Sequence, residues 1–109
     1  MALHLIIAFE DRALRDICQS DTATAAEFGS ELGELLQDRL ADMVAAQVLS
    51  ELVVGNCRSD PGDPATFILD LGKSSLLRFK ATDKHSRGRA AEAVDKSRVS
   101  RVKVISVET

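Results

Sequence analysis

Basic side chains gather in the second half of the chain, where they could bind phosphate. Residues 64–109 hold ten Lys and Arg against five Asp and Glu. Cations that neutralise phosphates release counterions, so such binding weakens steeply as salt rises. The residues that we expect to contact a phosphate backbone are Lys80, Lys84, Arg87, Arg89, Arg98, Arg101 and Lys103. Arg78 lies in the same region, and its planar guanidinium can hold one phosphate through two parallel hydrogen bonds.

His85 lies inside the basic run 84–89 and can exchange a proton near neutral pH. Such a group can carry protons in general acid–base chemistry. The guanidinium of Arg78 could stabilise negative charge on a bound phosphate. Two structural alternatives stand beside this hypothesis: a solvated loop histidine, and an outward-facing arginine paired with a carboxylate.

The charge of the chain is divided between its two halves. Residues 1–63 carry four Arg against twelve Asp and Glu, whereas residues 64–109 carry an excess of five positive charges. This division predicts either different partners for the two halves or two solvated faces of one domain. The overall pI of about 5.3 is low for a protein that binds nucleic acid.

Composition predicts one cytoplasmic domain over residues 1–109, without a metal or a cofactor. Cys18 and Cys57 lack the paired spacing of a zinc site. No apolar run approaches the roughly 18 residues of a membrane span, and the first residues lack the pattern of a signal peptide. The sequence also contains no Gly-rich phosphate loop.

The first half of the chain predicts a strand and two helices. Residues 3–9 are apolar and β-branched, as in a buried strand, and residues 10–19 have helical spacing. A second helix follows the capping residues 20–22, and its apolar stripe predicts a core face. That stripe comprises Phe28, Leu32, Leu35, Leu36, Leu40, Met43 and Val44. Gly29 and Gly33 mark either a close helix crossing or a break between two helical pieces. Residues 48–53 suggest one further helical turn.

The second half predicts antiparallel strands. Residues 59–64 give the strongest turn signal, after which 66–71 and 76–81 form a hairpin. Residues 82–97 are polar and predict a loop or a frayed helix. In the last strand, Val99, Arg101 and Lys103 alternate with Ser100, Val102 and Val104. The expected fold is therefore α+β: an N-terminal strand, a helical hairpin, then antiparallel strands that form a small sheet.

Several segments, in this order, resemble the RelE/HigB toxin superfamily. Residues 39–46 (RLADMVAA) are similar to the helix ending R-L-x-x-L-x-A-A of that family, and residues 49–52 to the turn that follows it. Residues 56–58, 62–63, 67–71 and 77–79 resemble the succession C-H-E-L-x-G-D, F-x-L-D-L and Y-R-L-x-F. Residues 99–104 resemble the last strand. The most similar branch is the HigB-like group labelled "killer protein" or "killer suppression protein".

This resemblance implies a RelE-like fold and a toxin of a bacterial type II toxin–antitoxin pair that cleaves mRNA on the ribosome without a metal. It also implies a cognate antitoxin of the helix-turn-helix type. Arg78 matches the central-strand arginine of the family, and Arg58 stands where relatives carry His, so Arg58 or His85 would assist it. The chain departs from the family in having no Tyr and in ending at Glu108-Thr109. The alternative is a catalytically degenerate module that binds its antitoxin, or pairs with itself, without cleaving RNA.

Overall fold

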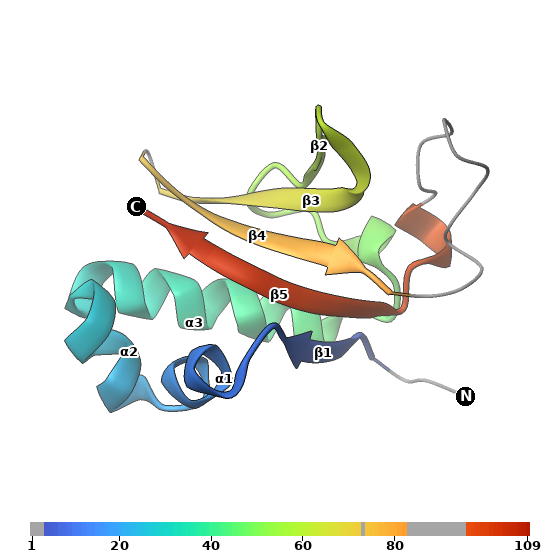
Figure 1. Ribbon diagram of the computed structural model, residues 1–109. Helices are drawn as coiled ribbons and strands as arrows, with labels where there is room; N and C mark the ends of the chain where they lie inside the picture. Colours follow the sequence, from blue (N-terminus) through green and yellow to red (C-terminus); the bar gives the residue numbers. More distant parts are fainter. Residues whose placement is uncertain (1–3, 73, 83–95) are drawn as a thin grey trace.

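The computed structural model describes residues 4–72, 74–82 and 96–109, and Figure 1 shows the arrangement of their helices and strands. Strand β1 (Ile6–Phe9) is followed by helices α1 (Arg12–Cys18), α2 (Asp21–Phe28) and α3 (Ser30–Ala45). A short 3₁₀ turn (Leu49–Glu51) leads to strands β2 (Arg58–Asp60), β3 (Asp63–Leu71) and β4 (Ser75–Ala81). A second 3₁₀ turn (Lys96–Arg98) precedes β5 (Arg101–Glu108). The predicted α+β class is confirmed.

The strands form one mixed sheet in the order β1-β5-β4-β3-β2. The pairs β2–β3, β3–β4 and β4–β5 are antiparallel, and the hairpin of β3 and β4 is the one that the sequence predicts. Strand β1 instead pairs parallel to β5, with Ile6 opposite Arg101 and Phe9 opposite Val104. The sheet therefore joins the two ends of the chain, and β1 occupies one of its edges (Figure 1).

Side-chain caps explain how α1 and α2 start. The Asp11 carboxylate accepts a hydrogen bond from the Leu14 amide at 2.8 Å, and the Ser20 hydroxyl accepts one from the Ala23 amide at 3.1 Å. Gly29 ends α2 with a φ of 88°, a backbone conformation that favours glycine. Gly33 lies where α3 crosses α2, since a Cβ there would be 3.2 Å from the Cα of Ala25. Both interpretations of the two glycines are therefore correct, one for each residue.

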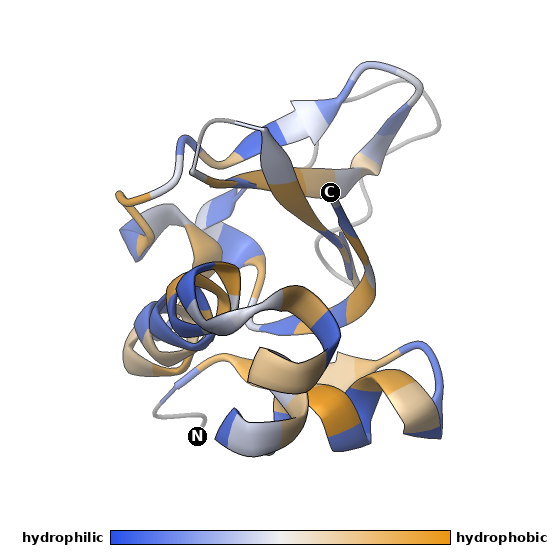
Figure 2. Ribbon diagram, turned by 90° about the vertical axis from the view of Figure 1, so that its left-hand side faces the viewer, coloured by the Kyte–Doolittle hydropathy of each residue, from blue (hydrophilic) through white to orange (hydrophobic). Residues whose placement is uncertain are grey.

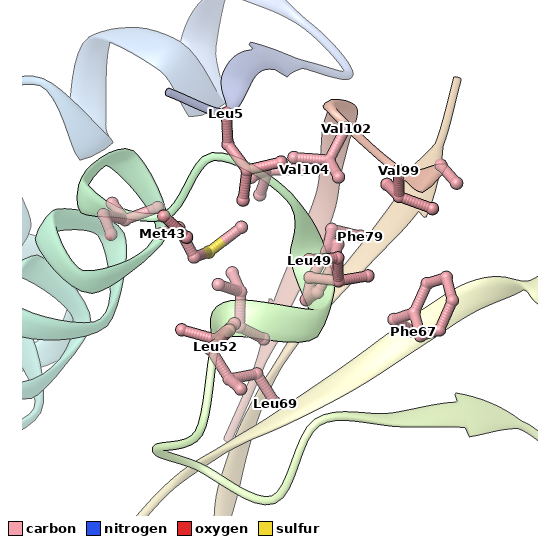
Figure 3. Packing of buried hydrophobic residues seen from close by; sticks show 14 of the residues in the cluster. Leu5, Met43, Leu49, Leu52, Phe67, Leu69, Phe79, Val99, Val102 and Val104 are labelled. Carbon is pink, nitrogen blue, oxygen red and sulfur yellow. The ribbon is translucent and has the colours of Figure 1, made fainter. Parts of the chain in front are cut away.

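The hydrophobic core lies between α3, the first 3₁₀ turn and one face of the sheet. Figure 3 shows Met43, Leu49 and Leu52 directed toward side chains of the strands. Phe67 of β3 and Phe79 of β4 stack within it, with ring centroids 5.9 Å apart. Because inward side chains of neighbouring strands lie opposite each other, the Phe pair extends across both strands of the hairpin.

Three details of the fold differ from the sequence-based expectations. Strand β2 falls partly inside the predicted turn, because a strand of three polar residues carries no apolar alternation. Val44 was expected in the core stripe but is 47% exposed. Val99 was placed on the same face as Arg101, yet it is buried just before β5 begins. The predictions for Val44 and Val99 are wrong for a related reason. Periodicity shows neither where a strand begins nor where the element that covers a helix ends.

Candidate functional site

Arg78 lies on β4, the central strand of the sheet, on the face opposite the core. It is opposite Ile68 in β3 and Ser106 in β5. The neighbouring residues Leu77 and Phe79 are fully buried, so the alternation of β4 directs Arg78 away from the core. Its side chain is 25% exposed. The predicted phosphate contact is thus on an accessible strand face rather than inside the protein.

Two carboxylates hold the guanidinium of Arg78. Its Nε donates to Oε2 of Glu108 on β5 at 2.6 Å, and its Nη1 donates to Oδ2 of Asp60 on β2. The side chain therefore reaches across β3 and links three strands. Asp60 also accepts a hydrogen bond from the Gly62 amide at 2.7 Å, which anchors the carboxylate in the turn between β2 and β3. Of the two alternatives considered for Arg78, the structure agrees with the arginine paired with carboxylates.

An irregularity in β5 brings Glu108 to this face. Phe79 is opposite Val104, whereas Arg78 is opposite Ser106, so β5 contains one extra residue at this point. A bulge of this kind shifts the alternation of all later side chains by one position. As a result, Ser106 and Glu108 share the face of Arg78, and Val107 packs against the core.

Three other predicted cations of the sheet are also paired with carboxylates. Arg58 Nη1 lies 3.0 Å from Asp70 Oδ1. Lys80 Nζ lies 3.9 Å from Asp63 Oδ2, and Lys103 Nζ lies 3.4 Å from Glu10 Oε2. Arg101 has an interaction partner as well. Arg58, Arg78, Lys80 and Lys103 therefore each lie close to at least one carboxylate.

The structure brings together some of the predicted site residues and leaves others out. Arg58 and Arg78 approach the same residue, Ile68, from the two strands beside β3. Arg98 is exposed in the 3₁₀ turn before β5. His85, Lys84, Arg87 and Arg89 lie outside the described residues. Asp60 and Glu108, which hold Arg78, were not predicted, because they are 18 and 30 positions away from it in the sequence.

These contacts shift the pKa values of both partners. The hydrogen bond from Arg78 lowers the pKa of Glu108 below its ordinary value, and the positive charge of the guanidinium adds to this effect. The hydrogen bond to Glu108 raises the pKa of Arg78 above its ordinary value, and Asp60 contributes in the same direction. Both groups are therefore charged at neutral pH, which favours the ion pair between them.

We expect Glu108→Gln to reduce the loss of unfolding free energy that occurs when the pH falls below neutral. A carboxylate whose pKa is lower in the folded state stabilises the protein above its unfolded-state pKa, and this contribution is lost as pH falls through the folded-state pKa. Urea unfolding at several values between about pH 7 and about pH 3 measures the effect. The free energy of unfolding should be higher for the wild type than for the variant at neutral pH, and this difference should disappear as the pH falls. Glu27→Gln, at an exposed position of α2, is the control and should run parallel to the wild type.

Among the residues that the structure describes, the remaining reactive groups give no further catalytic arrangement. Burial raises the pKa of the Cys18 thiol to about 11, and burial also raises that of Cys57, against the opposing charges of Lys96 and Arg58. Both thiols are thus protonated at neutral pH and are weak nucleophiles. Within the described ranges, no group of three or more His, Cys, Asp or Glu could hold a metal ion. No helix in this part of the chain is long and apolar enough to cross a membrane.

The sequence and fold were compared with family models, with characterised proteins and with solved structures. None of the three comparisons finds a match.

Proposed function

We propose that this chain is a binding module with a RelE/HigB-like scaffold, which engages an antitoxin partner and does not cleave RNA. The observation that carries this proposal is the pairing of the Arg78 guanidinium with the carboxylates of Asp60 and Glu108. Arg78 is the residue on which the nuclease hypothesis depends most. Its engagement by two carboxylates assigns it a structural role, as a link between β2, β4 and β5.

A phosphate would have to compete with both carboxylates for the same guanidinium. Two of the five N–H groups of the guanidinium already donate, from Nε to Glu108 and from Nη1 to Asp60, so a phosphate would find only the remaining donors of Nη1 and Nη2. The approaching phosphate would also be repelled by both carboxylates. This competition opposes stabilisation of the transition-state charge, which is the role that a nuclease requires of Arg78.

The charge balance of the same face supports the proposal. Affinity for a nucleic-acid backbone arises mainly from cations that replace counterions on phosphates. Here Arg58, Lys80 and Lys103 each lie within 4.0 Å of a carboxylate, so an approaching backbone meets both signs of charge. The field that would attract RNA is therefore weak on the strands of this face.

The competing candidate is the metal-free mRNA endoribonuclease that the sequence predicts. One observation favours it: Arg58, Arg78, Lys80 and Lys103 share a single face of the sheet. Inducible expression in bacteria separates the two candidates. We expect that induction of the wild type neither arrests growth nor cleaves transcripts, and that Arg78→Ala behaves identically. Growth arrest with transcript cleavage, relieved by Arg78→Ala, would overturn the proposal. The binding function further predicts copurification with a small helix-turn-helix protein encoded beside this chain.

A further inference from the structure

An apolar groove runs between the edge strand β1 and helix α3. Its volume is about 690 Å³, and Ile6, Ile7 and Phe9 line it on one side. Leu40, Ala41 and Val44 line it on the other. Figure 2, coloured by hydropathy, shows apolar and polar turns side by side on α3. The groove is distinct from the Arg78 face, because Arg78 and its two carboxylates do not contribute to its lining.

The exposed apolar side chains concentrate at this groove and beside it. Ile6 and Val44 are 39% and 47% exposed, and both line the groove. Val53 and Val54 are 86% and 40% exposed, and they line an adjoining hollow that shares Ala45 with the groove. These four are the exposed large hydrophobic residues of the described chain. Their gathering along one strip is typical of a protein-binding surface.

The backbone of β1 offers hydrogen bonds to a partner along the same groove. The amides of Ile6 and Glu10 donate to the carbonyls of Ser100 and Val104, at 2.9 Å and 2.8 Å. Because successive amides of a strand point to opposite sides, those of Ile7 and Phe9 point away from β5. The Leu5 amide already donates to the carbonyl of Ala46 at 2.7 Å, so the open part of the edge begins after it. An open strand edge accepts an extended segment from another chain.

The charge of the helical layer indicates the kind of segment that would bind. Residues 10–45 contain nine Asp and Glu against three Arg. On α3, Glu34 and Asp38 line a neighbouring hollow that shares Gln37 with the groove. A second copy of this chain would bring the same negative charge to the interface. A basic segment would be attracted instead.

We propose that this groove is the docking site for a partner protein, which inserts an extended segment of alternating apolar and basic side chains. The segment adds a strand to β1, places its apolar side chains against Ile7, Phe9 and Val44, and directs its cations toward the carboxylates of α3. This inference rests on the proposed binding function and specifies the surface and the chemistry of the partner. The Arg78 face is not needed for it.

A labelled peptide of four Val-Lys repeats, acetylated and amidated at its ends, tests the site. We expect saturable binding by fluorescence polarisation, at least tenfold tighter than for the matching Val-Glu peptide. Val44→Arg should weaken binding of the Val-Lys peptide at least tenfold, because it fills the groove and repels the cations. Ala26→Arg, the same change of charge at an exposed position of α2, should leave it unchanged. Hydrogen exchange should slow at the amides of Ile7 and Phe9 when the Val-Lys peptide is bound.

Absence of binding, equal binding of the two peptides, or equal loss in both variants would overturn the docking site. A dimer, seen by light scattering and dissociated by Val44→Arg, would overturn the choice of occupant and assign the groove to a second copy. None of these outcomes depends on RNA cleavage. Failure of this inference is therefore distinguishable from failure of the proposed function, which the growth experiment measures.

Discussion

The double variant Asp60→Asn/Glu108→Gln is expected to bind single-stranded RNA about tenfold more tightly than the wild type at low salt. The two substitutions retain side-chain shape but remove the carboxylates that hold Arg78. The guanidinium then becomes available to a phosphate, and one charged hydrogen bond contributes about 1.5 kcal/mol, or roughly a tenfold change in affinity. Fluorescence polarisation with a labelled oligonucleotide at several salt concentrations measures the gain and its salt dependence.

The control for this experiment changes the same charge elsewhere. Glu27→Gln/Glu31→Gln removes two negative charges from exposed positions of α2 and α3, far in sequence from Arg78. We expect this control to change RNA affinity much less. If the wild type already binds RNA tightly, and the Asp60→Asn/Glu108→Gln protein binds no better, the carboxylates do not block Arg78. The structural role that we assign to this arginine would then be wrong.

The second prediction concerns the core: Phe79→Ala should reduce the free energy of unfolding by about 3–5 kcal/mol. Phe79 is fully buried and stacks on Phe67, so its truncation leaves a cavity and removes an aromatic contact. Small domains have total stabilities of about 5–15 kcal/mol, and the loss is therefore a large fraction of the whole. In a domain of this size, the melting temperature should fall by about 12 °C or more. Urea denaturation and thermal circular dichroism measure both quantities.

Two matched substitutions define the specificity of this effect. Phe79→Leu keeps much of the apolar volume and should be less destabilising than Phe79→Ala. Val53→Ala removes an apolar group that is 86% exposed, and its effect should stay within about 0.5 kcal/mol. Equal losses for Phe79→Ala and Val53→Ala would contradict the packing described for the β3 and β4 hairpin.

Much of the element order could be predicted from local sequence. The hairpin of β3 and β4 was predictable because apolar alternation flanks a short connection, and both signals lie within about fifteen residues. The break at Gly29 and the crossing at Gly33 were also visible as alternatives. The sequence could not choose between them, because only contact with α2 distinguishes a glycine that ends a helix from one that permits a close approach.

The groove beside β1 was not predictable, and the reason is tertiary. Helical periodicity assigned Val44 to the core with Leu40 and Met43, since all three share one face of the helix. In the structure, the sheet ends at β1, so Leu40 and Met43 are buried whereas Val44 remains 47% exposed. The parallel pairing of β1 with β5, between segments about 95 positions apart, decides where the sheet ends.

The sequence by itself determined that this chain has basic, strand-borne residues suited to phosphate, with Arg78 at their centre and an acidic helical half before them. Only the tertiary structure decided that Arg78 is paired with Asp60 and Glu108. Strict alternation along the last strand would place Glu108 on the face of Val102 and Val104, away from Arg78. The bulge between the Val104 and Ser106 pairs reverses this, and the turn at Gly62 brings Asp60 to the other side. A shift of one residue in a strand register thus changes the candidate catalytic arginine into a link between strands.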